Sequence, residues 1–282
     1  MVAMFQDERI ILCTATLQSD PMQCSAEGFL GQLEAAAGAE FAGISLWQLH
    51  WILALGDGLA EEKARDAVDE AGLSVEMVEA IMPWSAPDDA KALEGAVGAF
   101  ELAASFETKN VLAVCLGDEM ESVKAGAARY REVCRAAADF GVAVPIEFLP
   151  WGAIPSIETA WQIVETADQE NGGILIDTWH WQRQPGGPDH EQLRQIPGEM
   201  IRAVQLCDAS HEAQGDDPMT ECMTARLLPG EGAVDFPPLL SDLADIGANP
   251  LWAPEVFSQK LSAQGPQAMA EAIREATLEV LE

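Results

Sequence analysis

Short apolar runs rich in β-branched residues recur along the whole chain at a nearly constant spacing. There are eight of them, and their starts lie 28 to 36 residues apart, except for a gap of 50 residues before the last one. One strand, one helix and two loops occupy about thirty residues, so the period predicts repeated strand–helix units. The predicted strands are RIILCT from Arg9, FAGISLW from Phe41, SVEMVEAI from Ser74, NVLAVCL from Asn110, VAVPIEF from Val142, GILIDT from Gly173, IRAVQLC from Ile201 and LWAPEVF from Leu251.

Amphipathic helical patterns lie between these runs. Gly72 and Gly141 follow apolar faces and are expected to end two of the helices in the left-handed conformation. The alternation predicts an α/β chain whose parallel strands close into a (β/α)8 TIM barrel. An open doubly wound sheet is the alternative, but it usually carries a glycine-rich phosphate loop after the first strand, and CTATLQSDP has none. The predicted helices cover residues 25–40, 56–72, 87–106, 121–141, 156–169 and 262–282.

The chain is expected to form a single TIM-barrel domain over residues 1–282. This length suits one barrel, and no low-complexity stretch or linker interrupts the pattern. Residues 208–236 are a polar segment that contains Gly and Pro, and we expect them to form an active-site wall or lid.

Composition limits the classes of partner. Fifteen basic and 47 acidic residues give a net charge of −32, which repels nucleic acids and anionic membranes. The N-terminal residues include Asp7, Glu8 and Arg9 and do not read as a signal peptide, and residues 41–55 are too interrupted to cross a bilayer. We therefore expect a cytoplasmic protein. Its six cysteines contain no Cys-x-x-Cys pair and are expected to be free.

Polar side chains stand at the ends of the last four predicted strands: Glu147, Asp177, Gln205 and Glu255. The carboxyl ends of barrel strands meet at one mouth, where such enzymes keep their chemistry. Three carboxylates in one place are costly unless a cation joins them. The four side chains therefore predict one divalent metal, with Mn²⁺ or Mg²⁺ preferred because the donors are oxygens, and Zn²⁺ or Co²⁺ possible.

The segments IEFLPW and IDTWHWQR, together with the order of elements, resemble the xylose isomerase-like barrel enzymes, a group of sugar isomerases and epimerases that shares its fold with endonuclease IV. The resemblance implies that Glu147, Asp177 and Glu255 are metal ligands. It also implies that His180 lies beside the reacting centre, where a neutral imidazole can hydrogen-bond a substrate hydroxyl. In the resembling epimerases two ligand glutamates serve as acid and base, which here are Glu147 and Glu255.

The resemblance has one departure, because Gln205 stands where most members of the family carry histidine. Gln205 can bind the metal through its amide oxygen, or a water can replace it, and Asp208 is the alternative ligand. The segment RLLPGEGAVDF resembles an Arg before a Gly-x-Gly turn of the family, so Arg226 is a candidate for holding a substrate oxygen, against a surface arginine as the alternative.

Other residues near the predicted strand ends are candidates for substrate binding. Arg183 can hold a carboxylate or phosphate, or pack on an aromatic face. His50 follows the second strand, whereas His190 and His211 lie in polar loops and are expected to be solvated. Tryptophans at strand ends can form a sugar-binding wall, although rim packing is the commoner role; they are Trp47, Trp84, Trp151 and Trp179.

This site predicts a metal-dependent isomerase or epimerase of a small sugar or polyhydroxy keto compound. A metal that polarises the carbonyl stabilises the enediolate formed when the neighbouring proton is lost. Departure of a β-hydroxyl from the same species would make the protein a lyase of the dehydroshikimate or inosose dehydratase type. A non-catalytic sugar-binding barrel and a DNA repair nuclease are weaker alternatives, since a three-zinc nuclease site needs more than four histidines. A homodimer is a possible assembly, because many barrel proteins form dimers.

Overall fold

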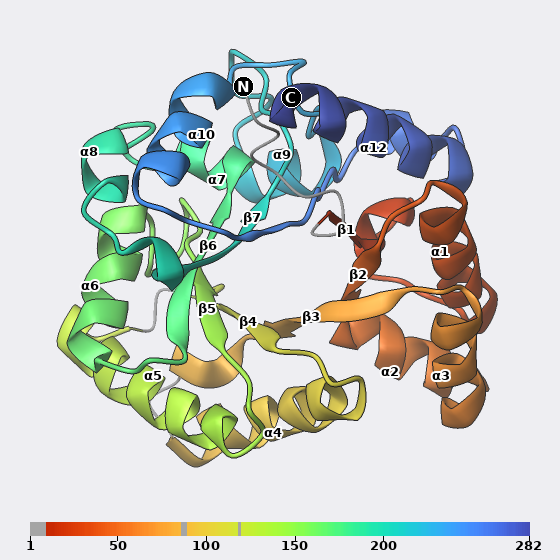
Figure 1. The fold of residues 1–282 in the computed structure, drawn as a ribbon, viewed down its shortest axis with the longest axis horizontal. Coiled ribbons are helices and arrows are strands. Elements are labelled where there is room, and N and C mark those ends of the chain that lie inside the picture. The colour runs from red at the N-terminus through yellow and green to blue at the C-terminus, as the bar shows by residue number, and fades with distance from the viewer. Residues whose placement is uncertain (1–9, 86–88, 118–119) are drawn as a thin grey trace. The chain divides into compact units, whose positions relative to one another are not determined.

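The computed structural model describes residues 10–85, 89–117 and 120–282. The predictions for Asp7, Glu8 and Arg9, and for the start of a helix at Pro87, lie outside the described residues. The eight strands form one sheet in the order β1 to β8, with helices between them, as predicted for a (β/α)8 barrel (Figure 1). They are β1 (Ile11–Cys13), β2 (Gly43–Trp47), β3 (Ser74–Ile81), β4 (Asn110–Val114), β5 (Val144–Glu147), β6 (Gly172–Asp177), β7 (Ile201–Gln205) and β8 (Leu251–Trp252).

Most of the helices occupy the segments between strands. All six predicted helices are present, and the segment 208–236 contains a short helix that the sequence did not predict. The α-helices are α1 (Ala26–Gly38), α2 (Gln48–Gly56), α3 (Glu61–Glu70), α4 (Asp89–Ser105), α5 (Val123–Ala138), α6 (Ile157–Ala167), α7 (Thr178–Arg183), α8 (His190–Leu193), α9 (Pro218–Thr224), α10 (Phe236–Asp245), α11 (Gln259–Ser262) and α12 (Pro266–Leu281). The 3-10 helices are η2 (Thr14–Leu17), η3 (Pro83–Ser85) and η4 (Gly198–Met200).

The helix boundaries follow local chemistry. Each of α1, α5 and α6 begins after a serine whose side chain accepts a hydrogen bond from a backbone N–H of the first turn. Gly72 and Gly141 have φ angles of 70° and 68°, which confirms the left-handed helix ends predicted for them. The capping serines are Ser25, Ser122 and Ser156.

The chain divides into two compact units. Unit 1 comprises residues 1–76, 205–234 and 251–282, and unit 2 comprises residues 77–204 and 235–250. The prediction of a single domain over residues 1–282 stays a prediction.

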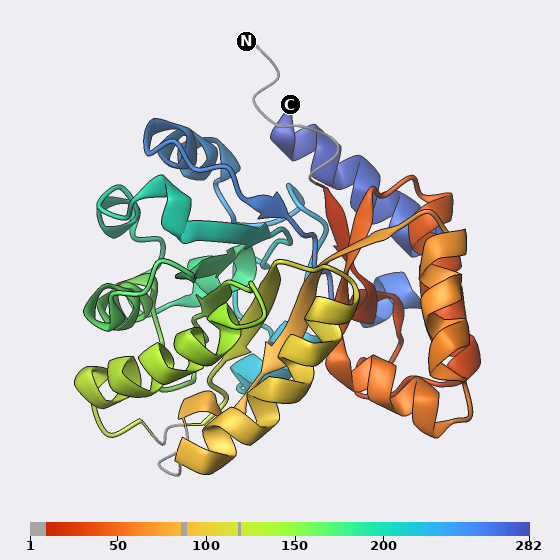
Figure 2. The same cartoon turned by 60° about the horizontal axis from the view of Figure 1, so that its bottom comes forward.

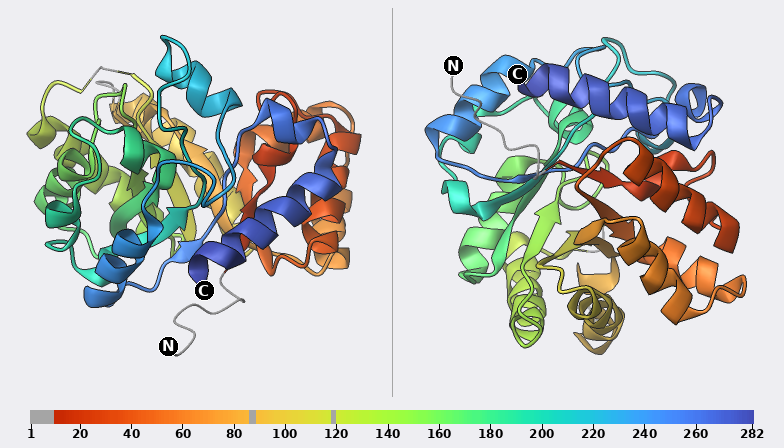
Figure 3. Two further views of the ribbon diagram at one scale, coloured as in Figure 1. Left: turned by 90° about the horizontal axis from the view of Figure 1, so that it is seen from above. Right: turned by 45° about the vertical axis from the view of Figure 1, so that its right-hand side comes forward.

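Unit 1 contains the first and last strands. β1 pairs in parallel with β2, from Ile11 opposite Gly43 onward. On its other side, Ile10 forms a parallel bridge with Trp252, and the Cys13 backbone N–H donates to the carbonyl of Pro254 at 3.2 Å. Helix α12 packs against α1 (Figure 3).

Unit 2 contains the parallel pairings β3/β4, β4/β5 and β5/β6. Every residue of β5 and β6 is buried, as expected of parallel strands covered on both faces. The helices α4, α5 and α6 follow one another along this part of the sheet, and α5 packs on both neighbours (Figure 2). The Tyr130 hydroxyl of α5 donates to the Val144 carbonyl and accepts from the Gly173 N–H, which ties the helix to two strands.

All six cysteines are free and buried, as predicted. Across the parts of the chain that the structure describes, no helix combines the length and apolar character needed to span a membrane.

Candidate metal centre

Glu147 is the last residue of β5 and lies in unit 2. The strand is held between β4 and β6, with Glu147 opposite Val114 on one side and Leu175 on the other. Its side chain is therefore fixed at the carboxyl end of the sheet, and only 6% of the residue is exposed. A carboxylate in such a place needs compensating polar partners.

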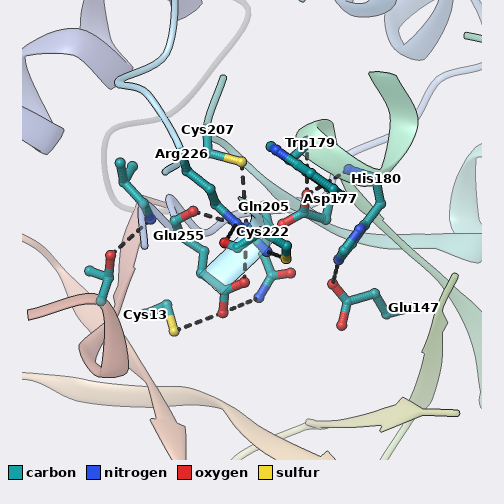
Figure 4. A network of polar contacts seen from close by, with 12 residues as sticks. Cys13, Glu147, Asp177, Trp179, His180, Gln205, Cys207, Cys222, Arg226 and Glu255 are labelled. Carbon is teal, nitrogen blue, oxygen red and sulfur yellow. Dashed lines mark hydrogen bonds and ion pairs between the residues drawn. The ribbon is translucent and has the colours of Figure 1, made fainter. Parts of the chain in front are cut away.

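Asp177 ends β6 and starts α7. Its Oδ1 accepts hydrogen bonds from the backbone N–H groups of Trp179, at 2.8 Å, and His180, at 3.0 Å. The carboxylate thus caps a short helix and turns the chain sharply after the strand. That turn places His180 Nε2 3.3 Å from Glu147 Oε1, as Figure 4 shows. The spacing of three residues between Asp177 and His180 therefore follows from the helix cap that Asp177 forms.

Glu147, Asp177 and His180 form one buried cluster. Each offers a ligand atom, and these atoms all lie within 4.8 Å of one another. Two carboxylates and an imidazole at this separation fit a divalent metal, because a cation offsets the repulsion between the acids. The donors predicted from the sequence were all oxygens, whereas this cluster adds a nitrogen, which zinc and cobalt accept more readily than magnesium does.

Aromatic side chains surround His180 within unit 2. The rings of Trp151 and Trp179 each lie 5.3 Å from the imidazole, centroid to centroid, and 6.0 Å from each other. The Arg183 guanidinium carbon lies 5.6 Å from the centre of the Trp179 ring, a cation–π contact that matches the packing role considered for it.

Glu255 lies in unit 1 at the centre of another polar network, visible in Figure 4. Arg226 Nη1 lies 3.1 Å from Glu255 Oε2. Gln205 Nε2 and the Cys13 thiol both donate to Glu255 Oε1, at 3.2 and 3.1 Å. Three donors around one buried carboxylate occupy its acceptor oxygens and fix its orientation. No sequence pattern indicated Cys13, which is 242 positions from Glu255.

Arg226 is not the surface arginine that was the alternative. Only 1% of the residue is exposed. Besides the Glu255 carboxylate, its guanidinium donates to the backbone carbonyls of Cys222, at 2.9 Å, and Glu255, at 3.1 Å. Its guanidinium carbon also lies 5.1 Å from the centre of the Phe257 ring. The structure therefore shows Arg226 orienting Glu255, and its contact with substrate stays a prediction.

Asp208, the alternative metal ligand, organises a loop in unit 1. Its Oδ1 accepts from the backbone N–H groups of Ala209, at 2.8 Å, and Val234, at 2.9 Å, and its Oδ2 accepts from Gly230, at 3.1 Å, and Gly232, at 2.8 Å. Four backbone donors satisfy this fully buried carboxylate. Asp208 therefore fits a loop anchor better than a metal ligand.

His50 is fully buried in unit 1 on α2, a helix that the sequence did not predict. Its Nε2 lies 2.8 Å from the Pro21 carbonyl and its Nδ1 lies 3.0 Å from the Gln32 amide nitrogen. The carbonyl can only accept and the amide nitrogen can only donate, so the ring is neutral with the proton on Nε2. Both nitrogens are used inside the protein, which favours a structural role over substrate binding.

The two loop histidines differ from each other. His190 was expected to be solvated, which is wrong: its Nδ1 lies 2.7 Å from Asp242 Oδ2, and Arg194 contacts the same carboxylate at 2.9 Å. The partners come from α8 and α10, 52 positions apart, and local sequence cannot reveal such a pair. His211 is exposed, as predicted.

Two of the predicted wall tryptophans pack inside the protein. Trp84 is fully buried, donates its indole N–H to the Val114 carbonyl at 3.1 Å and packs edge-on against Tyr130. Trp47 is half-buried and packs on Phe257 with a centroid distance of 5.6 Å. Rim and core packing, the commoner role, describes both.

The chain is similar to known enzymes that have different activities. A 3-dehydroshikimate dehydratase of Pseudomonas aeruginosa is 28% identical over 249 residues, which are 85% of this chain and 38% of that protein. An inosose isomerase of Bacillus subtilis is 29% identical over 167 residues, 57% of this chain and 58% of that protein. The chain thus spans less than two thirds of the length of either relative.

Solved structures support the fold. A crystal structure of the IolI protein with a bound zinc atom has a TM-score of 0.83 at 20% identity, covering 96% of this chain and 97% of that one. A D-allulose 3-epimerase from Methylomonas sp. has a TM-score of 0.73 at 16% identity, covering 96% and 97%. The family model described as xylose isomerase-like TIM barrel matches residues 33–278. The chain belongs to the xylose isomerase-like TIM barrel family.

Proposed function

We propose that the protein is a divalent-metal-dependent enzyme that moves the proton next to the carbonyl of a small polyhydroxy compound. The observation that carries this proposal is the buried cluster of Glu147, Asp177 and His180, whose ligand atoms lie within 4.8 Å of one another. Burying two acids and an imidazole together is costly for stability alone. Such clusters are typical of sites that bind metal or transfer protons.

The residues of the cluster have distinct roles in this proposal. Asp177 and Glu147 hold the metal, which, when bound, would polarise the substrate carbonyl. Glu147 also takes the proton from the neighbouring carbon. His180 Nε2, 3.3 Å from Glu147 Oε1, orients that carboxylate and contacts a substrate hydroxyl. The preference for manganese or magnesium stays a prediction, and the zinc bound by IolI supports only a divalent ion.

Glu255 is proposed as the second acid and base, and Gln205 and Glu255 as further metal ligands. The support is the family resemblance and the three donors, Arg226, Gln205 and Cys13, that hold the Glu255 carboxylate in one orientation. A base held in one geometry is a more effective proton acceptor.

An isomerase or epimerase is the first candidate for the reaction. Relatives named inosose isomerase and D-allulose 3-epimerase support it. A dehydratase is the second candidate, favoured by the match to 3-dehydroshikimate dehydratase over 85% of this chain. Both begin with loss of the same proton and differ in whether a hydroxyl then leaves.

The test is incubation of metal-loaded protein in D₂O with ketoses, inososes and 3-dehydroshikimate, while NMR follows deuterium at the α-carbon and any alkene product. Glu147→Gln and Glu255→Gln are each expected to lower the exchange rate by at least about 100-fold, the range of a general base. Glu165→Gln, an exposed position on α6, is the control. Full exchange in Glu147→Gln, or failure of the protein to bind any divalent ion, would refute the proposal.

A further inference from the structure

Two indole N–H groups beside the candidate centre have no hydrogen-bond partner among the described residues. They belong to Trp151 and Trp179, and both nitrogen atoms are buried. A buried donor without an acceptor is rare in folded proteins, because it loses its hydrogen bonds to water and gains none. By contrast, the indole N–H of the fully buried Trp84 donates to a backbone carbonyl. The two donors are therefore available to an acceptor from outside the chain, either a water molecule or a group of a ligand.

Their position ties this acceptor to the proposed substrate. Trp151 follows β5 and Trp179 follows β6, so both come from the strands that carry Glu147 and Asp177. Each ring lies 5.3 Å from His180, centroid to centroid, and His180 contacts Glu147. Figure 4 shows Trp179 next to Asp177 and His180.

The charge nearby selects the kind of acceptor. The Arg183 guanidinium lies 5.6 Å from the centre of the Trp179 ring, in a chain whose net charge is −32. The carboxylates of Glu147 and Asp177 lie in the same cluster as His180, so an anionic ligand needs this guanidinium and the cation proposed for the cluster to offset their charge. Hydrogen bonds to a charged acceptor are about twice as strong as neutral ones. A carboxylate offers two acceptor oxygens for the two indole N–H groups and a single negative charge for one guanidinium.

We propose that the substrate is a polyhydroxy keto acid whose carboxylate accepts hydrogen bonds from Trp151 and Trp179 and is balanced by Arg183. This inference rests on the proposed function and narrows its substrate class from neutral sugars to sugar-like acids. It assigns the two tryptophans to substrate specificity, with the proton transfer left to the cluster of Glu147, Asp177 and His180.

Calorimetry of the metal-loaded protein with non-reacting probes tests the inference separately from catalysis. The probes are shikimate and its methyl ester, which share a ring and hydroxyls and differ in the charge of one group. We expect shikimate to bind at least about 10-fold more tightly than the ester, the scale of one hydrogen bond to a charged group. Equal affinities, or no binding of shikimate at millimolar concentration, would overturn the inference.

Variants locate the carboxylate. Trp151→Phe and Trp179→Phe remove the N–H and leave a smaller aromatic ring, and each is expected to weaken shikimate about 10-fold while changing the affinity of the ester, a neutral acceptor, by less. Arg183→Gln is expected to act in the same direction. Trp84→Phe, which removes a bonded indole N–H in the core, is the matched control and should leave both affinities unchanged. If neither Trp151→Phe nor Trp179→Phe alters shikimate binding, the donors serve another purpose and the inference falls.

The outcome is distinguishable from failure of the proposed function. Deuterium exchange into inososes or ketoses, without preferential binding of shikimate over its ester, would support metal-dependent proton transfer and exclude a keto acid as the required substrate. Selective binding of shikimate without exchange into 3-dehydroshikimate would support the carboxylate site and remove the proposed reaction.

Discussion

Replacing Asp208 with asparagine tests how strongly one carboxylate holds the loop that follows β7. Each of its two oxygens accepts two backbone N–H groups, from Ala209 and Val234 on one side and from Gly230 and Gly232 on the other. Asparagine keeps the shape but exchanges one oxygen for an NH₂ group. Two of the four donors then face a donor, and a fully buried unpaired donor costs about 1 to 3 kcal/mol, whereas the partly buried N–H groups of Gly230 and Gly232 cost less.

The expected loss of stability for Asp208→Asn is therefore about 1 to 6 kcal/mol, with the lower end reached if the NH₂ group faces the partly buried pair, against the 5 to 15 kcal/mol that is typical for a folded protein. Urea unfolding at pH 7 measures it, and hydrogen exchange measures the backbone amides of Gly230, Gly232 and Val234 directly. These amides should lose protection even where the rest of the protein keeps it.

Asp189→Asn is the matched control, because Asp189 is a helix N-cap that accepts from the Gln192 N–H, and asparagine caps as well as aspartate. A loss below about 0.5 kcal/mol in Asp208→Asn, with amide protection unchanged, would refute the anchoring role and return Asp208 to the candidates for metal binding.

Three further predictions concern the metal centre, a buried histidine and a glycine. Asp177→Asn keeps the helix cap but removes a charged ligand, so calorimetry with Mn²⁺ and Zn²⁺ should show at least about a 10-fold loss of affinity; unchanged affinity would exclude Asp177 as a ligand. Burial lowers the pKa of His50 below its usual 6.5, so the unfolded chain binds a proton at higher pH than the folded protein does. The free energy of unfolding should therefore fall as pH drops below 6.5, by up to about 1.4 kcal/mol per pH unit. His50→Gln should remove this slope in urea unfolding between pH 5 and 8, and an unaltered slope would assign it to other groups. Gly232→Ala would place a Cβ 2.2 Å from the Ala209 carbonyl oxygen, so a loss of about 1 to 3 kcal/mol is expected, and a stable variant with an unchanged melting temperature would contradict the close packing.

The sequence predicted the features that depend on periodicity. The eight apolar runs predicted all eight strands, and the parallel barrel then required Glu147, Asp177 and Gln205 to stand at strand ends, where the structure has them. Some helices were missed because they are short or begin unusually: α7 has only six residues, and α10, with ten, has two prolines directly after Phe236.

The contacts within the site could not be predicted in the same way. Arg226 and Glu255 are 29 positions apart, and Cys13 reaches Glu255 from the opposite end of the chain. His50 follows β2 and was expected at the mouth, but α2 turns it toward Gln32 and Pro21. Side-chain partners of this kind are set by the folded chain, whereas strand positions are set by local pattern.

The pairing of the first strand with the last has a consequence during synthesis. Ile10 and Cys13 find their partners at Trp252 and Pro254, about 240 residues later in the chain. At a typical 5 to 20 residues per second, the ribosome needs roughly 10 to 50 s to supply them. Until then one edge of β1 stays without a neighbour and is open to strands of other chains. A circular permutant that joins the two termini and opens the chain elsewhere would make this pairing early and should aggregate less during expression.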